Sequence, residues 1–263
     1  MNEEIQIDGL KVNYCVVGRG QPVIILHGWG SRLEIWANVQ EKIALRGFKV
    51  IVPDLIGFGR SDLPLDGWDM DKYAFWFESF VEKISEKHPE FKKSIFLVGH
   101  SFGGRILIKI AARRKIPLRG IALCAAAGLK SDTSLKVQMI SSVSKSAARL
   151  MDILKLSRLK DPLRNLYYHL LRQNDYLKVP RTMRDTFRKV IEEDLSKHLS
   201  EIKVPTLVIW GKEDRIVPIK QAYRFYQGIS CSELKIMPGV GHSPQLEQPD
   251  NLAEFLLEFF ANH

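Results

Sequence analysis

Cysteine is scarce in this 263-residue sequence, and the three cysteines present lie far apart. Cys15, Cys124 and Cys231 form no CxxC pair, which argues against a disulfide framework and against a zinc knuckle. Their number and spacing are typical of reduced thiols in a cytoplasmic protein. The sequence has no HExxH motif and no close cluster of histidine and cysteine, so we predict no metal site.

Long apolar runs are also missing. No run approaches the roughly 20 residues that a membrane-spanning helix needs. The first residues, MNEEIQIDG, are acidic where a secretory signal would carry positive charge. Glycine-rich loops with GxGxxG or Walker spacing do not occur either. We therefore predict a cytoplasmic protein with no membrane span and no nucleotide cofactor.

Six short apolar runs predict strands that are buried on both faces, as in a parallel sheet. They span residues 22–26, 48–52, 94–98, 119–124, 205–210 and 233–237. Before them, two alternating runs flank Asp8 and Gly9, a pair that suits a tight hairpin turn. Patterns of helical period lie at residues 35–46, 71–87, 102–115, 218–227 and 250–261. This alternation indicates an α/β fold with helices on both faces of the sheet.

The alternation stops at residues 130–199, where helical patterns continue without a convincing strand. Pro162 and Pro180 stand where the first turn of a helix tolerates proline. We therefore predict that residues 130–199 form a helical cap. It is inserted into one α/β core that comprises residues 1–129 and 200–263.

The same segment carries most of the positive charge of the chain. Residues 130–199 hold 15 lysines and arginines against 8 acidic residues, in a protein of net charge +9. These cations suit a solvated face, or a surface that steers an anionic substrate or an acidic carrier protein toward a pocket. They lack the frame of an RRM, KH or helix-turn-helix domain, so nucleic-acid binding is not expected.

The sharpest local motif is Gly-His-Ser-Phe-Gly-Gly at residues 99–104. A Gly-x-Ser-x-Gly match alone is a weak signal. Here it directly follows a predicted strand and directly precedes a predicted helix, which is the setting of a nucleophile elbow. Small neighbours let the backbone at Ser101 take the strained turn that exposes the hydroxyl at the helix N-terminus. Ser101 is the predicted nucleophile.

A serine hydroxyl near neutral pH needs a base in contact and a carboxylate that holds the base. Asp214 follows the fifth apolar run, and His242 lies in a glycine-rich loop after the sixth. Both loops stand at the carboxyl ends of predicted strands, where open α/β sheets bind ligands. We predict Asp214 as the acid and His242 as the base. Glu213 and His100 are the alternative acid and base.

With these residues in the order Ser, Asp, His, the chain resembles the α/β-hydrolase superfamily, in its branch of small capped serine esterases. The likeness spans nearly the whole sequence and includes His27-Gly28-Trp29-Gly30 and the loop from Asp54 to Ser61. It implies an eight-stranded, mostly parallel sheet with a cap that supplies much of the substrate pocket. It also implies that the backbone N–H groups of Trp29 and Phe102 form the oxyanion hole. His27 and Asp54 are expected to brace the turns that carry them.

The predicted activity is hydrolysis of a small-molecule carboxylic ester through an acyl-serine intermediate. Lactones and thioesters are open to the same chemistry, and C–C bond hydrolysis and perhydrolysis use the same fold. Serine at the elbow argues against dehalogenase or epoxide hydrolase chemistry, which in this superfamily resembles attack by an aspartate. The alternatives outside enzymes are a hydrolase-like ligand receptor and an adaptor that docks an acidic protein on the basic cap.

Overall fold

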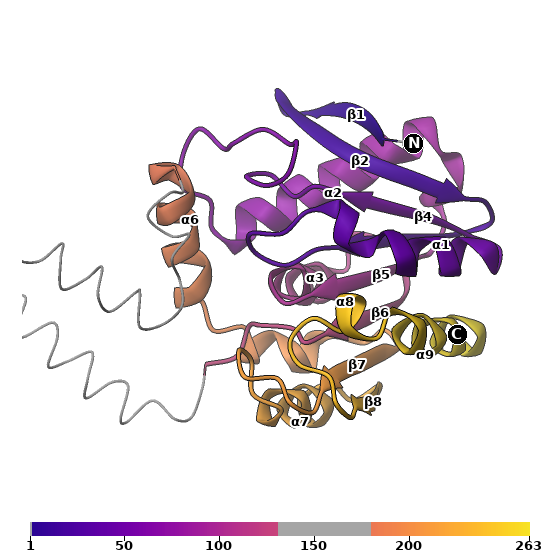
Figure 1. Cartoon of the computed structure of the whole chain (residues 1–263). Coiled ribbons are helices and arrows are strands. Elements are labelled where there is room, and N and C mark those ends of the chain that lie inside the picture. The colour runs from indigo at the N-terminus through magenta and orange to yellow at the C-terminus, as the bar shows by residue number, and fades with distance from the viewer. Residues whose placement is uncertain (1, 131–179) are drawn as a thin grey trace, which may run out of the picture.

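The computed structural model describes residues 2–130 and 180–263, which fold around one eight-stranded sheet (Figure 1). The strands are β1 (Asn2–Ile7), β2 (Leu10–Gly18), β3 (Gln21–Leu26), β4 (Phe48–Pro53), β5 (Ile95–His100), β6 (Leu118–Cys124), β7 (Thr206–Gly211) and β8 (Ser232–Met237). Each apolar run predicted as a strand is a strand. The predicted hairpin joins β1 to β2, with φ angles of 50° at Asp8 and 80° at Gly9.

The strand order is β1-β2-β4-β3-β5-β6-β7-β8. β2 runs antiparallel to both of its neighbours, and all other pairs are parallel. The chain passes from β3 outward to β4 and then returns to the other side of β3 to form β5. The carboxyl ends of β3 and β5 therefore lie side by side where the winding reverses, which is the usual place for a ligand crevice in an open α/β sheet.

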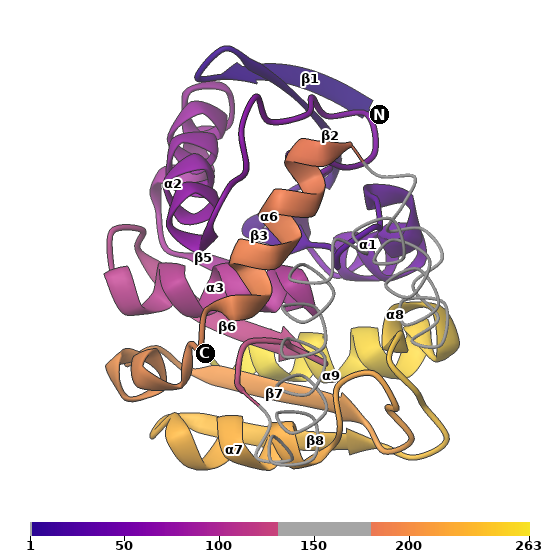
Figure 2. The same cartoon turned by 90° about the vertical axis from the view of Figure 1, so that its left-hand side faces the viewer.

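Helices cover both faces of this sheet (Figures 1 and 2). α1 (Ala37–Leu45) and α9 (Pro249–Asn262) lie on one face, and α2 (Met70–Lys87), α3 (Phe102–Arg113) and α7 (Lys220–Gly228) lie on the other. Successive side chains of a strand point to opposite faces. In β3, Ile25 packs in the core on the α1 side, whereas Ile24 packs in the core on the α2 side. This double burial explains why the strands are continuous apolar runs.

Short helices join the main elements: η1 (Leu33–Trp36), η2 (Pro89–Lys92), η4 (Ser196–Glu201) and α8 (Pro244–Glu247). The helix predicted at 35–46 thus begins as the 3₁₀ turn η1 and continues as α1. α2 begins after Asp69, whose carboxylate accepts the N–H of Lys72 at 2.9 Å. None of the helices in the described ranges is both long and apolar enough to cross a membrane.

Most of the predicted cap, residues 131–179, lies outside the described residues. The chain resumes at Pro180 with α6 (Arg181–Glu192), which lies across the edge of the sheet formed by the carboxyl ends of the strands (Figure 2). Thr186 accepts the N–H of Trp68 at 2.9 Å, and the ring of Phe187 lies 5.0 Å from that of Trp29. α6 is therefore packed on the loop before α2 and on the turn after β3.

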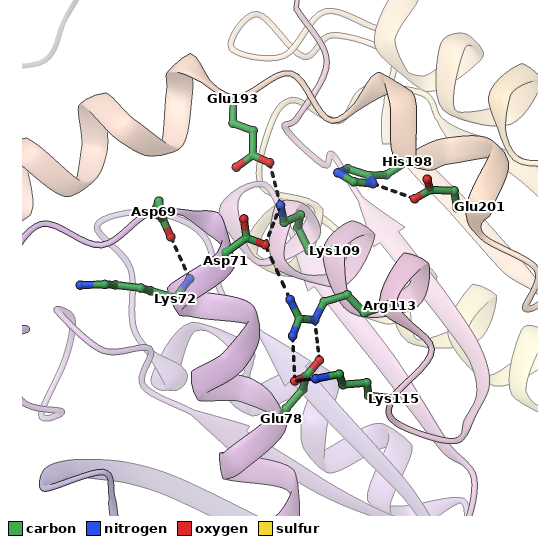
Figure 3. A network of polar contacts seen from close by, with 10 residues as sticks. All are labelled: Asp69, Asp71, Lys72, Glu78, Lys109, Arg113, Lys115, Glu193, His198 and Glu201. Carbon is green, nitrogen blue, oxygen red and sulfur yellow. Dashed lines mark hydrogen bonds and ion pairs between the residues drawn. The ribbon is translucent and has the colours of Figure 1, made fainter.

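A network of ion pairs joins the segment after α6 to the core (Figure 3). Lys109 of α3 lies 2.9 Å from Asp71 of α2 and 2.8 Å from Glu193. One turn further along α3, Arg113 donates to Glu78 of α2 at 2.7 Å. Although burial opposes the charge of the ammonium group, the hydrogen bonds that Lys109 donates to Asp71 and Glu193 raise its pKa. The network thus holds α2, α3 and the segment after α6 together.

Arg105 strengthens the same attachment. Its guanidinium donates to the carbonyl of Val190 and, at 2.6 Å, to the carbonyl of Glu193. These carbonyls lie at the C-terminal end of α6, where a helix leaves acceptors without intrahelical partners. Burial lowers the pKa of Arg105 to about 10, which leaves the group charged at neutral pH. Arg105 therefore caps α6 from α3.

Candidate active site

Ser101 stands at a sharp turn between β5 and α3. Its φ of 50° and ψ of −105° are strained for a residue with a side chain. The surrounding residues have no room for side chains: a Cβ at Gly99 would lie 2.8 Å from Gly103, and one at Gly103 would lie 2.4 Å from the carbonyl oxygen of Leu26. The glycines of the motif thus allow β3, β5 and α3 to meet closely. Ser101 is therefore the residue directly before α3, on a strained turn between strand and helix.

Asp214 and His242 are brought together by the loops after β7 and β8. His242 Nδ1 donates to Asp214 Oδ2 at 2.8 Å, since a carboxylate can only accept. The other oxygen, Oδ1, accepts the N–H groups of Ile216 at 2.8 Å and Val217 at 2.9 Å. The Asp214 carboxylate is buried, and these three bonds fix its plane. In a neutral imidazole this arrangement leaves Nε2 as a bare acceptor.

The alternative acid, Glu213, has no hydrogen bond to His242 in the described part of the chain. Glu213 is exposed, and its N–H donates to the carbonyl of Val240 at 3.0 Å. Together with the bond from Lys212 N–H to the carbonyl of Met237 at 3.0 Å, this contact ties the loop of the acid to the loop of the base. Asp214 is thus the carboxylate that faces His242.

Ser101 and His242 lie at the same edge of the sheet and are linked through His100. The ring of His100 lies 5.0 Å from that of His242, and its Nε2 donates to the His242 carbonyl at 2.7 Å. Within residues 2–130 and 180–263, no hydrogen bond joins the Ser101 hydroxyl to the His242 ring. Catalytic hydrogen bonds are often long in unliganded enzymes and tighten with substrate, so the geometry leaves Nε2 available.

His100 itself does not have the environment of a base. Its ring fills the space between His242 and Gly28, where a Cβ would lie 2.8 Å from the His100 Nδ1. Burial, with a contribution from His242, lowers its pKa to about 3. The ring is therefore neutral, and its only proton is on Nε2, which is bonded to a carbonyl. His100 acts in the packing of the site.

Trp29 and Phe102 carry the two N–H groups predicted as the oxyanion hole. Phe102 is the first residue of α3, where backbone N–H groups have no intrahelical partner. The N–H of Trp29 has no acceptor in the described part of the chain. The rings of the two residues lie 5.2 Å apart in an edge-to-face contact, which holds the turn after β3 against the start of α3.

His27 and Asp54 brace the turns beside the site, as expected. His27 Nε2 accepts the N–H of Leu55 at 2.9 Å, and Asp54 accepts the N–H groups of Leu33 at 2.8 Å and Arg60 at 2.9 Å. Burial lowers the pKa of His27 to about 4, so that the ring stays neutral and can accept. Both side chains are fully buried.

One contact at the site was not predicted from the sequence. Glu247 Oε2 accepts the N–H of Gly241 at 2.7 Å, and its Oε1 accepts the N–H of Ser243 at 2.9 Å. These are the residues on either side of His242. The signal in the sequence is a carboxylate five residues after the histidine, which is weak without coordinates. As for metals, no group of three or more potential ligands is assembled in the two described ranges.

The sequence profile of the family described as "Serine aminopeptidase, S33", of the Hydrolase_4 type, matches residues 20–249. This match covers the elbow, both loops and the turn after β3. The chain belongs to the α/β-hydrolase superfamily.

Two curated relatives illustrate the range of this superfamily. The 2-hydroxy-6-oxo-6-(2'-aminophenyl)hexa-2,4-dienoic acid hydrolase of Metapseudomonas resinovorans is 25% identical, over 98% of this chain and 90% of that protein. The monoacylglycerol lipase ABHD6 of Bos taurus is also 25% identical, over 95% of this chain and 79% of that protein.

The fold of this α/β-hydrolase has a solved counterpart in a serine hydrolase involved in carbazole degradation, the CarC enzyme. The TM-score is 0.75 and the identity 24%, over 100% of this chain and 99% of that chain. At this identity the likeness is one of fold.

Proposed function

We propose that this α/β-hydrolase cleaves carboxylic esters of small molecules through an acyl-serine intermediate. The observation that carries the proposal is the 2.8 Å hydrogen bond from His242 Nδ1 to Asp214, at the sheet edge where Ser101 stands on its elbow. Because Nδ1 holds the proton, Nε2 is free to accept one. A serine, an oriented imidazole and a buried carboxylate are the three parts of a nucleophile that works near neutral pH.

In the proposed reaction, Ser101 Oγ attacks the carbonyl carbon of the ester and transfers its proton to His242 Nε2. The carbonyl oxygen becomes an oxyanion that the N–H groups of Trp29 and Phe102 stabilise. The tetrahedral intermediate then breaks its bond to the alcohol, which leaves with the proton from His242. Water, deprotonated by His242, attacks the acyl group and releases the acid and the free Ser101 hydroxyl. Asp214 keeps the proton of Nδ1 in place throughout.

We further propose that residues 130–199 form the cap of this site. Support comes from α6, the described part of that segment, which packs Phe187 against Trp29 and Met183 against Gly57. A Cβ at Gly57 would lie 2.3 Å from the terminal carbon of Met183. These apolar contacts place α6 next to the proposed oxyanion hole, where a cap would limit the size of the substrate and exclude water.

A second candidate is hydrolysis of a C–C bond next to a ketone. The relative from Metapseudomonas resinovorans is a hydrolase of a dienoic acid with a 6-oxo group, which belongs to the C–C hydrolases of meta-cleavage products. The monoacylglycerol lipase relative supports the ester hypothesis in the same measure. Both reactions need an oxyanion hole and an imidazole that moves protons. They differ in the leaving group, which is an alcohol in one and a carbon acid in the other.

The test combines labelling with turnover. The protein is treated with a fluorophosphonate, and the modified residue is located by mass spectrometry. The treated and untreated proteins are then assayed on p-nitrophenyl esters of graded acyl length and on a β-diketone. We expect modification of Ser101, turnover of at least one ester, and loss of turnover in proportion to labelling.

Two results would contradict the proposal. Modification at another residue with Ser101 untouched would remove the nucleophile. Turnover of the diketone with none on any ester would replace ester hydrolysis with the C–C reaction. A large shift in melting temperature on ligand binding, with only single-turnover cleavage, would instead favour a receptor.

A further inference from the structure

The peptide units around His242 are held by two side chains that take no part in the proposed proton transfers. Glu247 lies on α8, directly after the His242 loop (Figure 1). One of its oxygens accepts from Gly241 at 2.7 Å and the other from Ser243 at 2.9 Å. A single carboxylate therefore bonds both N–H groups that flank the histidine. Hydrogen bonds to a charged acceptor are roughly twice as strong as neutral ones, so the Glu247 carboxylate holds these two N–H groups strongly.

The third main-chain contact comes from the opposite side. The carbonyl of His242 accepts the Nε2–H of His100 at 2.7 Å. His100 is the last residue of β5 and the neighbour of Ser101, so this bond connects the base directly to the strand of the nucleophile. The ring also fills the space beside Gly28, in the turn that precedes Trp29. The buried imidazole of His100 thus contacts both His242 and the turn at Gly28, and the next residue in the chain is Ser101.

We propose that Glu247 and His100 are positioning residues for His242. The Glu247 carboxylate fixes the two N–H groups that flank the histidine, and the His100 ring fixes its carbonyl. These three hydrogen bonds restrict movement of the main chain at His242. The bond from its ring to Asp214 restricts rotation of the side chain. The inference rests on the proposed function, because the orientation of His242 matters only if His242 acts as the base.

The exposure of Glu247 separates positioning from general stability. The residue is exposed, and within residues 2–130 and 180–263 its carboxylate bonds only to the two N–H groups of the loop. Its removal opens no cavity in either core. A change at Glu247 should thus leave the fold intact and loosen the loop, whereas a change at buried His100 affects packing as well. Glu247 is therefore the primary position for the test.

The experiment compares the parent protein with Glu247→Ala, Glu247→Gln and the matched control Glu254→Gln. Glu254 is an exposed glutamate of α9 that has no partner in the described part of the chain. Two quantities are measured: the rate and the final extent of fluorophosphonate labelling, and kcat and KM on a p-nitrophenyl ester that the parent turns over. Melting temperatures are recorded for each protein.

We expect Glu247→Ala to lower both the labelling rate and kcat by about tenfold or more, since a displacement near 1 Å can reduce a rate by up to about a hundredfold. KM should stay within about twofold and the final extent of labelling should equal that of the parent. Glu247→Gln, with one acceptor oxygen left, should fall between the two. Glu254→Gln should match the parent.

A parent-like labelling rate in Glu247→Ala would overturn the inference. So would a lower final extent of labelling with an unchanged rate, because that result means fewer folded molecules rather than a misplaced base. The pair His100→Gln and His100→Met gives an independent readout, since Gln can donate to the His242 carbonyl and Met cannot. Equal kcat in the two variants would overturn the role of His100. Failure of the parent to label at Ser101 would contradict the proposed function itself and is distinguishable from all of these.

Discussion

Two polar clusters in this molecule are built in different ways. At the proposed site, the carboxylates of Asp214 and Glu247 bond largely to main-chain N–H groups of short loops at the ends of strands, and the His242 ring bonds to Asp214. In the network of Figure 3, long side chains bond to one another: Lys109 and Arg113 of α3 reach carboxylates of α2 and of the segment after α6. In the first cluster, bonds to the main chain fix the orientation of each carboxylate. In the second, the bonded groups stand at the ends of side chains with several rotatable bonds.

The two kinds of bonding suit different roles. A carboxylate bonded to two or three backbone N–H groups has one orientation, and so does the ring that donates to it. A lysine between two carboxylates can follow small movements of its partners without losing the attraction. We infer that the first cluster sets the geometry of reacting groups and the second attaches one segment to another.

The largest effect is expected from Ser101→Ala. Loss of the nucleophile in a triad of this kind lowers kcat by about a million-fold. The melting temperature should stay close to that of the parent, because the Ser101 side chain makes no capping hydrogen bond to α3 and the strained backbone remains. Ester turnover and thermal unfolding check both points. An active Ser101→Ala variant would mean that Ser101 is not the nucleophile. The first cluster would then have no role in orienting the groups that react.

The second largest loss of kcat is expected from Asp214→Asn. Ile216 and Val217 already donate to one oxygen of Asp214, so an asparagine would keep its oxygen there and turn its amide toward His242 Nδ1. Nδ1 would become the acceptor and the proton would move to Nε2, which removes the base. We expect a loss of about ten thousand-fold in kcat. Glu213→Gln is the matched control and should retain parental kcat; equal losses in both would refute the assignment of Asp214.

The pH dependence of stability tests two buried rings beside the first cluster, those of His27 and His100. Burial lowers the pKa of His27 to about 4 and that of His100 to about 3, below the usual 6.5 of the unfolded chain. The unfolded state therefore binds more protons in this range, and stability is full above about pH 6.5 and falls as the pH drops toward 4. Each ring should contribute a slope of about 1 kcal/mol per pH unit.

Urea unfolding at pH 7, 6 and 5 measures this slope. His263→Gln, at the exposed C-terminus, should leave the slope unchanged. A free energy of unfolding that is constant from pH 7 to 5 would mean that the two rings are not buried as described.

The smallest effect concerns the second cluster. Lys109→Met leaves Asp71 and Glu193 without their shared cation, but both carboxylates are partly exposed, at 55% and 24% of the side-chain surface. We expect the free energy of unfolding to fall by about 1–2 kcal/mol, less than for a fully buried pair. Turnover should stay within a few-fold of the parent, since the attachment is shared with Arg105.

Lys83→Met is the control for this prediction, because Lys83 and Glu86 form an exposed pair on α2. It should change the free energy of unfolding by less than about 1 kcal/mol. If Lys109→Met instead lowered kcat as strongly as Asp214→Asn, the division between orientation and attachment would be wrong.

Most of the fold could be predicted from the sequence because its signals are local. Strands β3 to β7 are largely buried on both faces and therefore appear as continuous apolar runs, and the Asp8-Gly9 turn has the residues that its φ angles require. The docking of α6 could not be predicted. Arg105 and Lys109 look like ordinary solvent-facing cations of an amphipathic helix, and only the return of the chain after α6 buries them.

The candidate site divides in the same way. Ser101, Asp214 and His242 stand in short motifs whose position after a strand is visible in the sequence. The contacts of His100 and Glu247 depend on how closely the ends of strands approach, which no local pattern encodes. His100 in particular could not be placed, because its direction is set by the space left at Gly28 and by the His242 carbonyl.

The close approach of β7 to the His242 loop constrains how this protein can change. A Cβ at Gly211 would lie 2.1 Å from the carbonyl oxygen of Gly241 and 2.3 Å from that of Val240. Any larger residue at 211 would act as a wedge between the two loops. Redesign of substrate preference is therefore better directed at α6 and the turns it touches, while position 211 stays a glycine and the two loops keep their lengths.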